Sequence, residues 1–205
     1  MKRKILVVVI LIILNIFLAL LVSIDVEADN LKDKMIDRAM MVNQKEVLYN
    51  PRLNATDVIT YEQAYNRVDA IFYYAKKFND MYDIHPRRVT KDMYAIIEME
   101  TRFVNYRSLD NGLSFGVPSI QIRTAEWVAN KLDEDFNLYE TQSNTRKQVR
   151  YAVYYYYYLL QHYNDRYKAI LGYNVGHNLP DEQRWRNYFF NIIGRLHYYE
   201  QIWEE

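Results

Sequence analysis

One glutamate, Glu100, occupies a position that suits acid catalysis. On a helix it shares one face with three apolar residues, at the spacing i, i+3, i+4 and i+7: Met93, Ile96 and Ile97. Glutamate has an ordinary pKa of about 4.3, and apolar surroundings raise it because they penalise the charged carboxylate. A carboxyl group that keeps its proton can protonate a leaving oxygen, as glycosidic cleavage requires. Taken alone, the pattern is more typical of a solvated glutamate at a helix end.

The composition excludes several other chemistries. The 205-residue chain has no Cys, which rules out disulfides, thiolate metal sites and a cysteine nucleophile. Its 4 His residues lack the spacing of a zinc site, so we expect neither a metal nor a cofactor. Lys and Arg total 26 and Asp and Glu total 26, and this balance argues against a nucleic-acid partner.

The amino-terminal segment predicts a membrane anchor. Residues 5–24 are almost wholly apolar and follow a basic start, and about 20 apolar residues are enough to cross a bilayer. Basic residues on that side favour the cytoplasm, so the remainder of the chain is expected outside it. We therefore predict a single-pass cell-membrane protein with an extracytoplasmic domain. The alternative is a signal sequence cleaved near residues 26–28, which would make the protein secreted.

Helical signals dominate the rest of the chain. Thr60 and Gln63 form a capping-box pattern that begins a helix ending near Met81. The low counts of Gly (5) and Pro (4) also favour a mainly helical protein. Residues 105–123 are rich in turn residues, with room for two short strands. Further helices are expected at about 91–102, 124–132, 145–162, from 169, and at 184–203, the one at 145–162 being Tyr-rich and buried.

Three short motifs occur in the order of a known family. Residues 82–86 and 95–103 resemble the opening of the lytic transglycosylase (SLT) domain, whose apolar helix ends in Glu-Ser-x-Phe, here with Thr101 for Ser. Residues 114–119, followed by Thr124 and Ala125, keep the spacing of the family's glycine-rich block. Residues 171–176 resemble Ala-Ala-Tyr-Asn-x-Gly, and the tail around Tyr188 resembles the closing helix. The likeness covers about residues 61–203.

The resemblance implies a fold and an activity. The fold would be mainly α, a lysozyme-like α+β domain with a small β or loop region at 60–205, preceded by a stalk at 29–59 and the transmembrane anchor at 1–28. The substrate would be the glycan strands of peptidoglycan. Glu100 would protonate the oxygen between MurNAc and GlcNAc, then take the proton of the MurNAc 6-hydroxyl as a 1,6-anhydro ring closes. Tyr173 and Asn174 would line the sugar groove, and Thr101 is a further candidate for substrate contact.

Two departures leave the groove and the outcome open. The family's groove glutamine is replaced by Ser119 in an ungapped alignment, and Gln121, two residues later, could take its place. The spacing between Pro86 and Glu100 is also a few residues longer than usual. Three alternatives therefore remain: a lysozyme-type hydrolase with Asp110 as its second carboxylate, a catalytically weak glycan-binding or scaffolding module of an envelope or virion, and a structural membrane protein.

Overall fold

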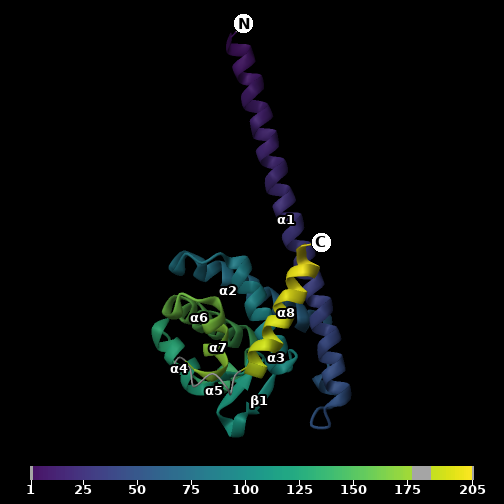
Figure 1. Cartoon of the computed structure of the whole chain (residues 1–205), viewed down its shortest axis with the longest axis vertical. Helices are drawn as coiled ribbons and strands as arrows, with labels where there is room; N and C mark the ends of the chain where they lie inside the picture. The colour runs from purple at the N-terminus through teal and green to yellow at the C-terminus, as the bar shows by residue number, and fades with distance from the viewer. Residues whose placement is uncertain (1, 177–185, 205) are drawn as a thin grey trace. The chain divides into compact units, whose positions relative to one another are not determined.

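The chain is a mainly α protein with one small antiparallel sheet (Figure 1). The computed structural model describes the backbone of residues 2–176 and 186–204, and the side chains of residues 13–16, 30–176 and 188–201. The helices are α1 (Lys2–Tyr49), α2 (Tyr61–Tyr82), α3 (Pro86–Thr101), α4 (Ile122–Lys131), α5 (Leu138–Ser143), α6 (Thr145–Tyr163), α7 (Arg166–Val175) and α8 (Arg186–Glu204). The strands are β1 (Tyr106–Leu109), β2 (Ser114–Gly116) and β3 (Ile120–Gln121), with 3-10 turns at Ala55–Asp57 and Asp110–Gly112.

The chain divides into two compact units, Met1–Met35 and Ile36–Glu205. The second unit therefore begins well before residue 60, and it includes the last part of α1. There the Asn43 side chain accepts a hydrogen bond from the Ile59 amide at 2.9 Å, which ties the segment expected as a stalk to the start of the domain.

The predicted membrane anchor falls largely outside the described side chains. Within the part that is described, no helix combines the length and hydropathy needed to cross a bilayer. Most side chains of residues 5–24 lie outside that part, so the anchor stays a prediction.

The ends of α2 and α3 follow local signals. The capping box at Thr60 and Gln63 is confirmed, since each side chain accepts from the other's backbone amide. Asp83 ends α2 in a left-handed conformation. α3 begins at Pro86, earlier than the predicted residue 91, because proline suits the first turn of a helix, where its missing N–H is not needed.

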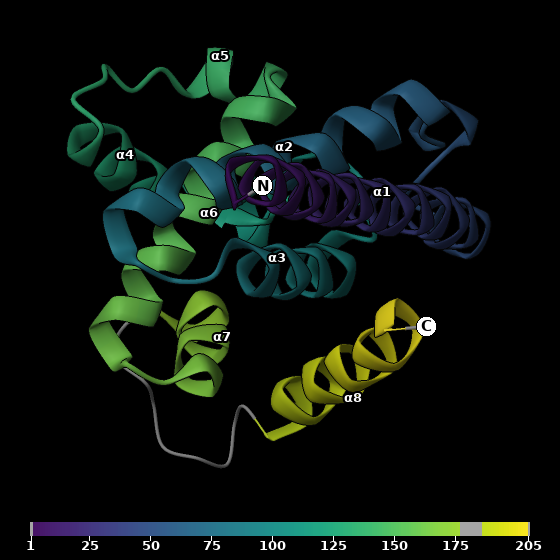
Figure 2. The ribbon, with the colours of Figure 1, turned by 90° about the horizontal axis from the view of Figure 1, so that it is seen from above.

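Helix α6 is the centre of the second unit, as its aromatic sequence predicted. It packs against α2, α3, α4, α5 and α7, and Figure 2 shows these helices gathered around it. Tyr151, Tyr156 and Tyr157 are fully buried. Buried hydroxyls need partners, and the Tyr157 hydroxyl donates to the Ala75 carbonyl of α2 while that of Tyr156 donates to Asp92 of α3. The tyrosines therefore join three helices by hydrogen bonds as well as by packing.

The sheet has three strands in the order β1-β2-β3, one more than the sequence predicted. Its central strand is buried, and Phe115 pairs with Ile120 across the turn that contains Ser119. β3 leads directly into α4. The sheet thus presents the 114–121 segment beside the carboxyl end of α3.

Candidate active site

The second unit contains a cleft of about 550 Å³ to which α3, the sheet region, α4, α6 and α7 all contribute. Five of the six predicted site residues line it: Glu100, Ser119, Gln121, Tyr173 and Asn174. The structure therefore brings together residues from three motifs that are separated along the chain.

Glu100 lines this cleft at the end of α3. It is half-buried, and its Oε1 accepts hydrogen bonds from Asn174 Nδ2 at 3.0 Å and from the Tyr188 hydroxyl at 2.7 Å. Burial raises the pKa of Glu100, while the bonds from Tyr188 and Asn174 favour the carboxylate and act in the opposite direction. The net effect is a pKa above the ordinary value. A carboxyl group whose pKa is raised keeps its proton to higher pH than an ordinary glutamate, which suits a proton donor.

Tyr188 joins the site from α8. Burial and the nearby charge of Glu100 raise the pKa of Tyr188 well above its ordinary value, so the phenol remains a neutral donor. Asn174 comes from the last turn of α7, which ends at Val175. The sequence indicated Tyr188 only as part of a closing helix and assigned it no role, because nothing local links it to a carboxylate in α3.

Asp110 is a second carboxylate of the cleft. Its negative charge contributes to the raised pKa of Glu100, whereas the charge of Arg102 lowers it. Asp110, Asn111 and Gly112 have successive positive φ angles of 50°, 58° and 89°. Non-glycine residues rarely adopt this conformation, and its concentration at one turn is typical of functional loops.

Thr101 is the predicted site residue that does not line the cleft. It is buried, and its hydroxyl bonds to the carbonyl of Ile97, one turn earlier in α3, and to the carbonyl of Val117. These bonds attach the end of the Glu100 helix to the 114–121 segment. Its geometry supports a positioning role, and contact with substrate stays a prediction.

Tyr173 and Ser119 form part of the cleft wall. The Tyr173 hydroxyl donates to the Pro118 carbonyl at 2.9 Å, so its polar tip is already hydrogen-bonded within the protein. Ser119 has a left-handed φ of 51°, and its amide donates to the Gly116 carbonyl at 3.2 Å. Gln121, by contrast, is exposed at the cleft margin.

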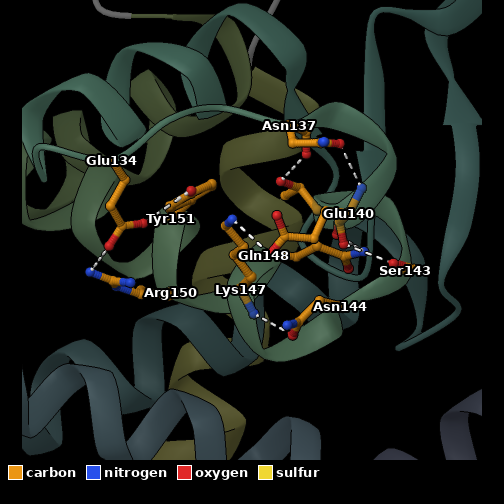
Figure 3. A network of polar contacts seen from close by, with 10 residues as sticks. Glu134, Asn137, Glu140, Ser143, Asn144, Lys147, Gln148, Arg150 and Tyr151 are labelled. Atoms are coloured by element: carbon orange, nitrogen blue, oxygen red, sulfur yellow. Dashed lines mark hydrogen bonds and ion pairs between the residues drawn. The ribbon is translucent and has the colours of Figure 1, made fainter.

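Gln148 supports this wall from behind, a role that the sequence did not indicate. Its Oε1 accepts from the Val117 amide at 3.0 Å, and its Nε2 donates to the carbonyls of Thr141 and Gln142 at 3.0 and 2.9 Å. Figure 3 shows Gln148 within a polar network that includes the caps of α5 and α6. A buried side chain with three such bonds holds the cleft wall in place.

Glu98, on another face of α3, is the second residue that the sequence did not single out. It is fully buried and accepts hydrogen bonds from Arg38, Arg195 and Tyr199. Two of these donors lie on α8, the helix that carries Tyr188. The cluster therefore holds α8 against α3, close to Glu100.

No metal or family assignment accompanies this geometry. Among the residues that the structure describes, no group of three or more His, Cys, Asp or Glu side chains is placed to hold a metal ion. No protein-family model matches the chain, and the comparison with curated proteins gave no match.

Proposed function

We propose that this protein is a membrane-anchored peptidoglycan lytic transglycosylase, with Glu100 as both general acid and general base. The observation that carries the proposal is the partly desolvated Glu100 carboxyl group, which lies in a cleft and accepts hydrogen bonds from Asn174 and Tyr188. An acid with a raised pKa in an open groove fits a reaction that needs one proton donor and a long polymeric substrate.

In the first step Glu100 donates its proton to the oxygen that links MurNAc to the next GlcNAc. The bond between this oxygen and the MurNAc anomeric carbon breaks, and the GlcNAc end leaves with a hydroxyl group. Positive charge develops at the anomeric carbon. The acetamido group of the same sugar stabilises this charge, so the step needs no second protein carboxylate.

In the second step the Glu100 carboxylate takes the proton of the MurNAc 6-hydroxyl. The 6-oxygen then bonds to the anomeric carbon and closes a 1,6-anhydro ring, and no water is consumed. The hydrogen bonds from Tyr188 and Asn174 stabilise the carboxylate present between the two steps. Glu100 ends the cycle protonated, ready for the next bond.

The proposal includes a lysozyme-like fold and an extracytoplasmic location. A helical domain whose small sheet borders the catalytic cleft supports the former. The apolar residues 5–24 behind a basic start support a single-pass anchor with the domain outside the cytoplasm. Membrane fractionation of the full chain, with protease access to the domain in intact cells, tests the location.

The activity is tested with peptidoglycan embedded in a gel. The wild-type chain should clear it, and Glu100→Gln, which keeps the shape but cannot donate the proton, should not. Mass spectrometry of the soluble products should find anhydro-ended fragments. A matched control is Glu126→Gln, an exposed position outside the cleft, which should clear the gel as the wild type does. Absence of clearing by the folded wild-type chain would reject the enzyme proposal.

A hydrolase is the second candidate, because Asp110 lines the same cleft as Glu100. A second carboxylate can activate water on the other face of the sugar. In that case the products carry reducing ends, and Asp110→Asn abolishes activity. Anhydro-ended products that persist in Asp110→Asn exclude this alternative.

A further inference from the structure

The α4 side of the cleft carries a cation and an aromatic ring one helical turn apart. Arg123 and Trp127 both line the cleft, and residues four apart on a helix are neighbours on one face. Lys131, a further turn along, lies with its Nζ 5.8 Å from the centre of the Trp127 ring. Neither Arg123 nor Trp127 belongs to the residues that surround Glu100.

A continuous row of aromatic rings connects this wall with the catalytic end of the cleft. The ring of Tyr173 lies 5.9 Å from that of Tyr155, which is 6.3 Å from Tyr158, which is 4.7 Å from Trp127. All four side chains line the cleft. Trp127 also lies 6.3 Å from Tyr155, so it is two ring-to-ring contacts from Tyr173, which directly precedes Asn174, the partner of Glu100. A single sugar does not span that row, and its far end is available to another unit of the same strand.

The charge of this wall is opposite to that of the catalytic end. Among the described residues that line the cleft, Glu100 and Asp110 are acidic and Arg123 is basic. Arg123 is exposed, and no ion pair of its guanidinium is found among the described residues. A guanidinium that is already paired would offer little to a ligand, whereas this one is available to a carboxylate.

We propose that Arg123, Trp127 and Tyr158 form a second sugar subsite, which binds a pyranose unit whose substituent carries a carboxylate. The apolar face of the pyranose packs on the rings of Trp127 and Tyr158, and the carboxylate pairs with Arg123. The inference rests on the proposed glycan substrate and adds its specificity. The subsite favours MurNAc units over GlcNAc, because only MurNAc carries a lactyl group, whose own carboxylate or whose peptide stem supplies the negative charge.

Binding is measured on the full chain by titration calorimetry with Glu100→Gln, which cannot cleave its ligand. Three tetrasaccharide probes separate the sources of charge: a neutral GlcNAc oligomer, an alternating GlcNAc–MurNAc oligomer with free lactyl groups, and the same oligomer with peptide stems. We expect at least one charged probe to bind about 3- to 5-fold more tightly than the neutral one, the gain of an exposed ion pair. Whichever charged probe binds more tightly identifies the carboxylate that Arg123 recognises.

Two further substitutions in the Glu100→Gln background test the roles separately. Arg123→Gln should remove the preference for charged probes and leave the affinity for the neutral probe unchanged. Trp127→Leu keeps apolar volume but removes the ring face, and should weaken all three probes by about 5- to 10-fold. Tyr158→Leu gives a second readout of the platform if Trp127→Leu fails to fold. The matched controls are Arg52→Gln and Tyr139→Ala, exposed positions outside the cleft, which should change nothing.

Three results would overturn the subsite. These are equal affinity for neutral and charged probes, a loss in Arg123→Gln that is the same for all probes, and full affinity in folded Trp127→Leu and Tyr158→Leu. Its failure is distinguishable from that of the proposed function. Clearing of peptidoglycan without the predicted probe discrimination rejects the subsite alone, whereas discrimination without clearing by the wild type rejects the lyase alone.

Discussion

The Tyr188 hydroxyl donates a hydrogen bond to Oε1 of Glu100 across 2.7 Å, although 88 positions separate the two residues. This bond joins α8 to the end of α3 at the point where the proposed chemistry occurs. Because the bond favours the charged form of the acid, it lowers the pKa of Glu100 and so opposes the effect of burial. The closing helix is therefore part of the candidate site.

Tyr188→Phe should shift the pH dependence of activity upward. The hydrogen bond from Tyr188 lowers the pKa of Glu100, so its removal raises that pKa further above the ordinary value. The protonated acid then persists to higher pH, and the alkaline limb of the rate profile moves in the same direction. The rate at the optimum should fall by roughly 10-fold, since a charge-assisted bond contributes about 1.5 kcal/mol. Turbidity loss of a peptidoglycan suspension, measured across pH, gives both values.

Tyr198→Phe, an exposed position on the same helix, is the control and should leave the profile unchanged. An alkaline limb that stays in place in Tyr188→Phe would contradict the role of this bond.

Glu100→Gln should make the protein more stable at neutral pH while it abolishes activity. Glu100 has a raised pKa in the folded state, so its ionisation opposes folding. The contribution of protonated Glu100 to the free energy of unfolding is fully present below the pKa of the unfolded state, near 4.3. This contribution is lost as the pH rises through the pKa of the folded state. Thermal melts should therefore place Glu100→Gln above the wild type at pH 7, and the difference should vanish near pH 3.5. A lower melting temperature for the variant at pH 7 would oppose this account.

Gly116→Ala should destabilise the cleft wall. A Cβ atom at this position would lie 2.6 Å from Cδ and Oε1 of Gln148, and the φ of 82° is strained for alanine. Moving Gln148 would break its bond with the Val117 amide. We expect a loss of about 2–3 kcal/mol in urea unfolding. Gly194→Ala is the control. Its Cβ would meet nothing within 4 Å, and alanine in a helix should be neutral or favourable by up to about 1 kcal/mol. Equal effects at the two glycines would reject the steric argument.

Glu98→Gln should cost about 2 kcal/mol of folding free energy. In the wild type, Arg38 and Tyr199 donate hydrogen bonds to the carboxylate of Glu98. The side-chain amide of glutamine would place an N–H group against one of these donors, and two donors cannot form a hydrogen bond. Chemical denaturation measures the loss, with the exposed Glu126→Gln as the matched control. Because the cluster also holds α8, activity should fall alongside stability. A variant as stable as the control would show that the buried charge is dispensable.

Local sequence signals predicted the helices and strands whose formation depends on residues a few positions apart in the chain. The capping box at Thr60 depends on residues three apart, and the apolar stripe before Glu100 depends on the helical repeat, so both are visible in a short window. The start of α3 was predicted late because the prediction relied on the apolar stripe and overlooked the preference of Pro86 for a first turn. The short helix α5 and the third strand were missed because their stability comes from packing against neighbours that are distant in sequence.

The sequence by itself determined a mainly helical protein with a carboxyl group at the end of an apolar helix face, since periodicity and capping are short-range effects. Only the tertiary structure decided which groups meet that carboxyl group. Asn174 and Tyr188 reach Glu100 from helices 74 and 88 positions away, and Gln148 supports the cleft wall beside Gly116 through the Val117 amide. Burial raises the pKa of an acid only once distant segments have packed around it and excluded water.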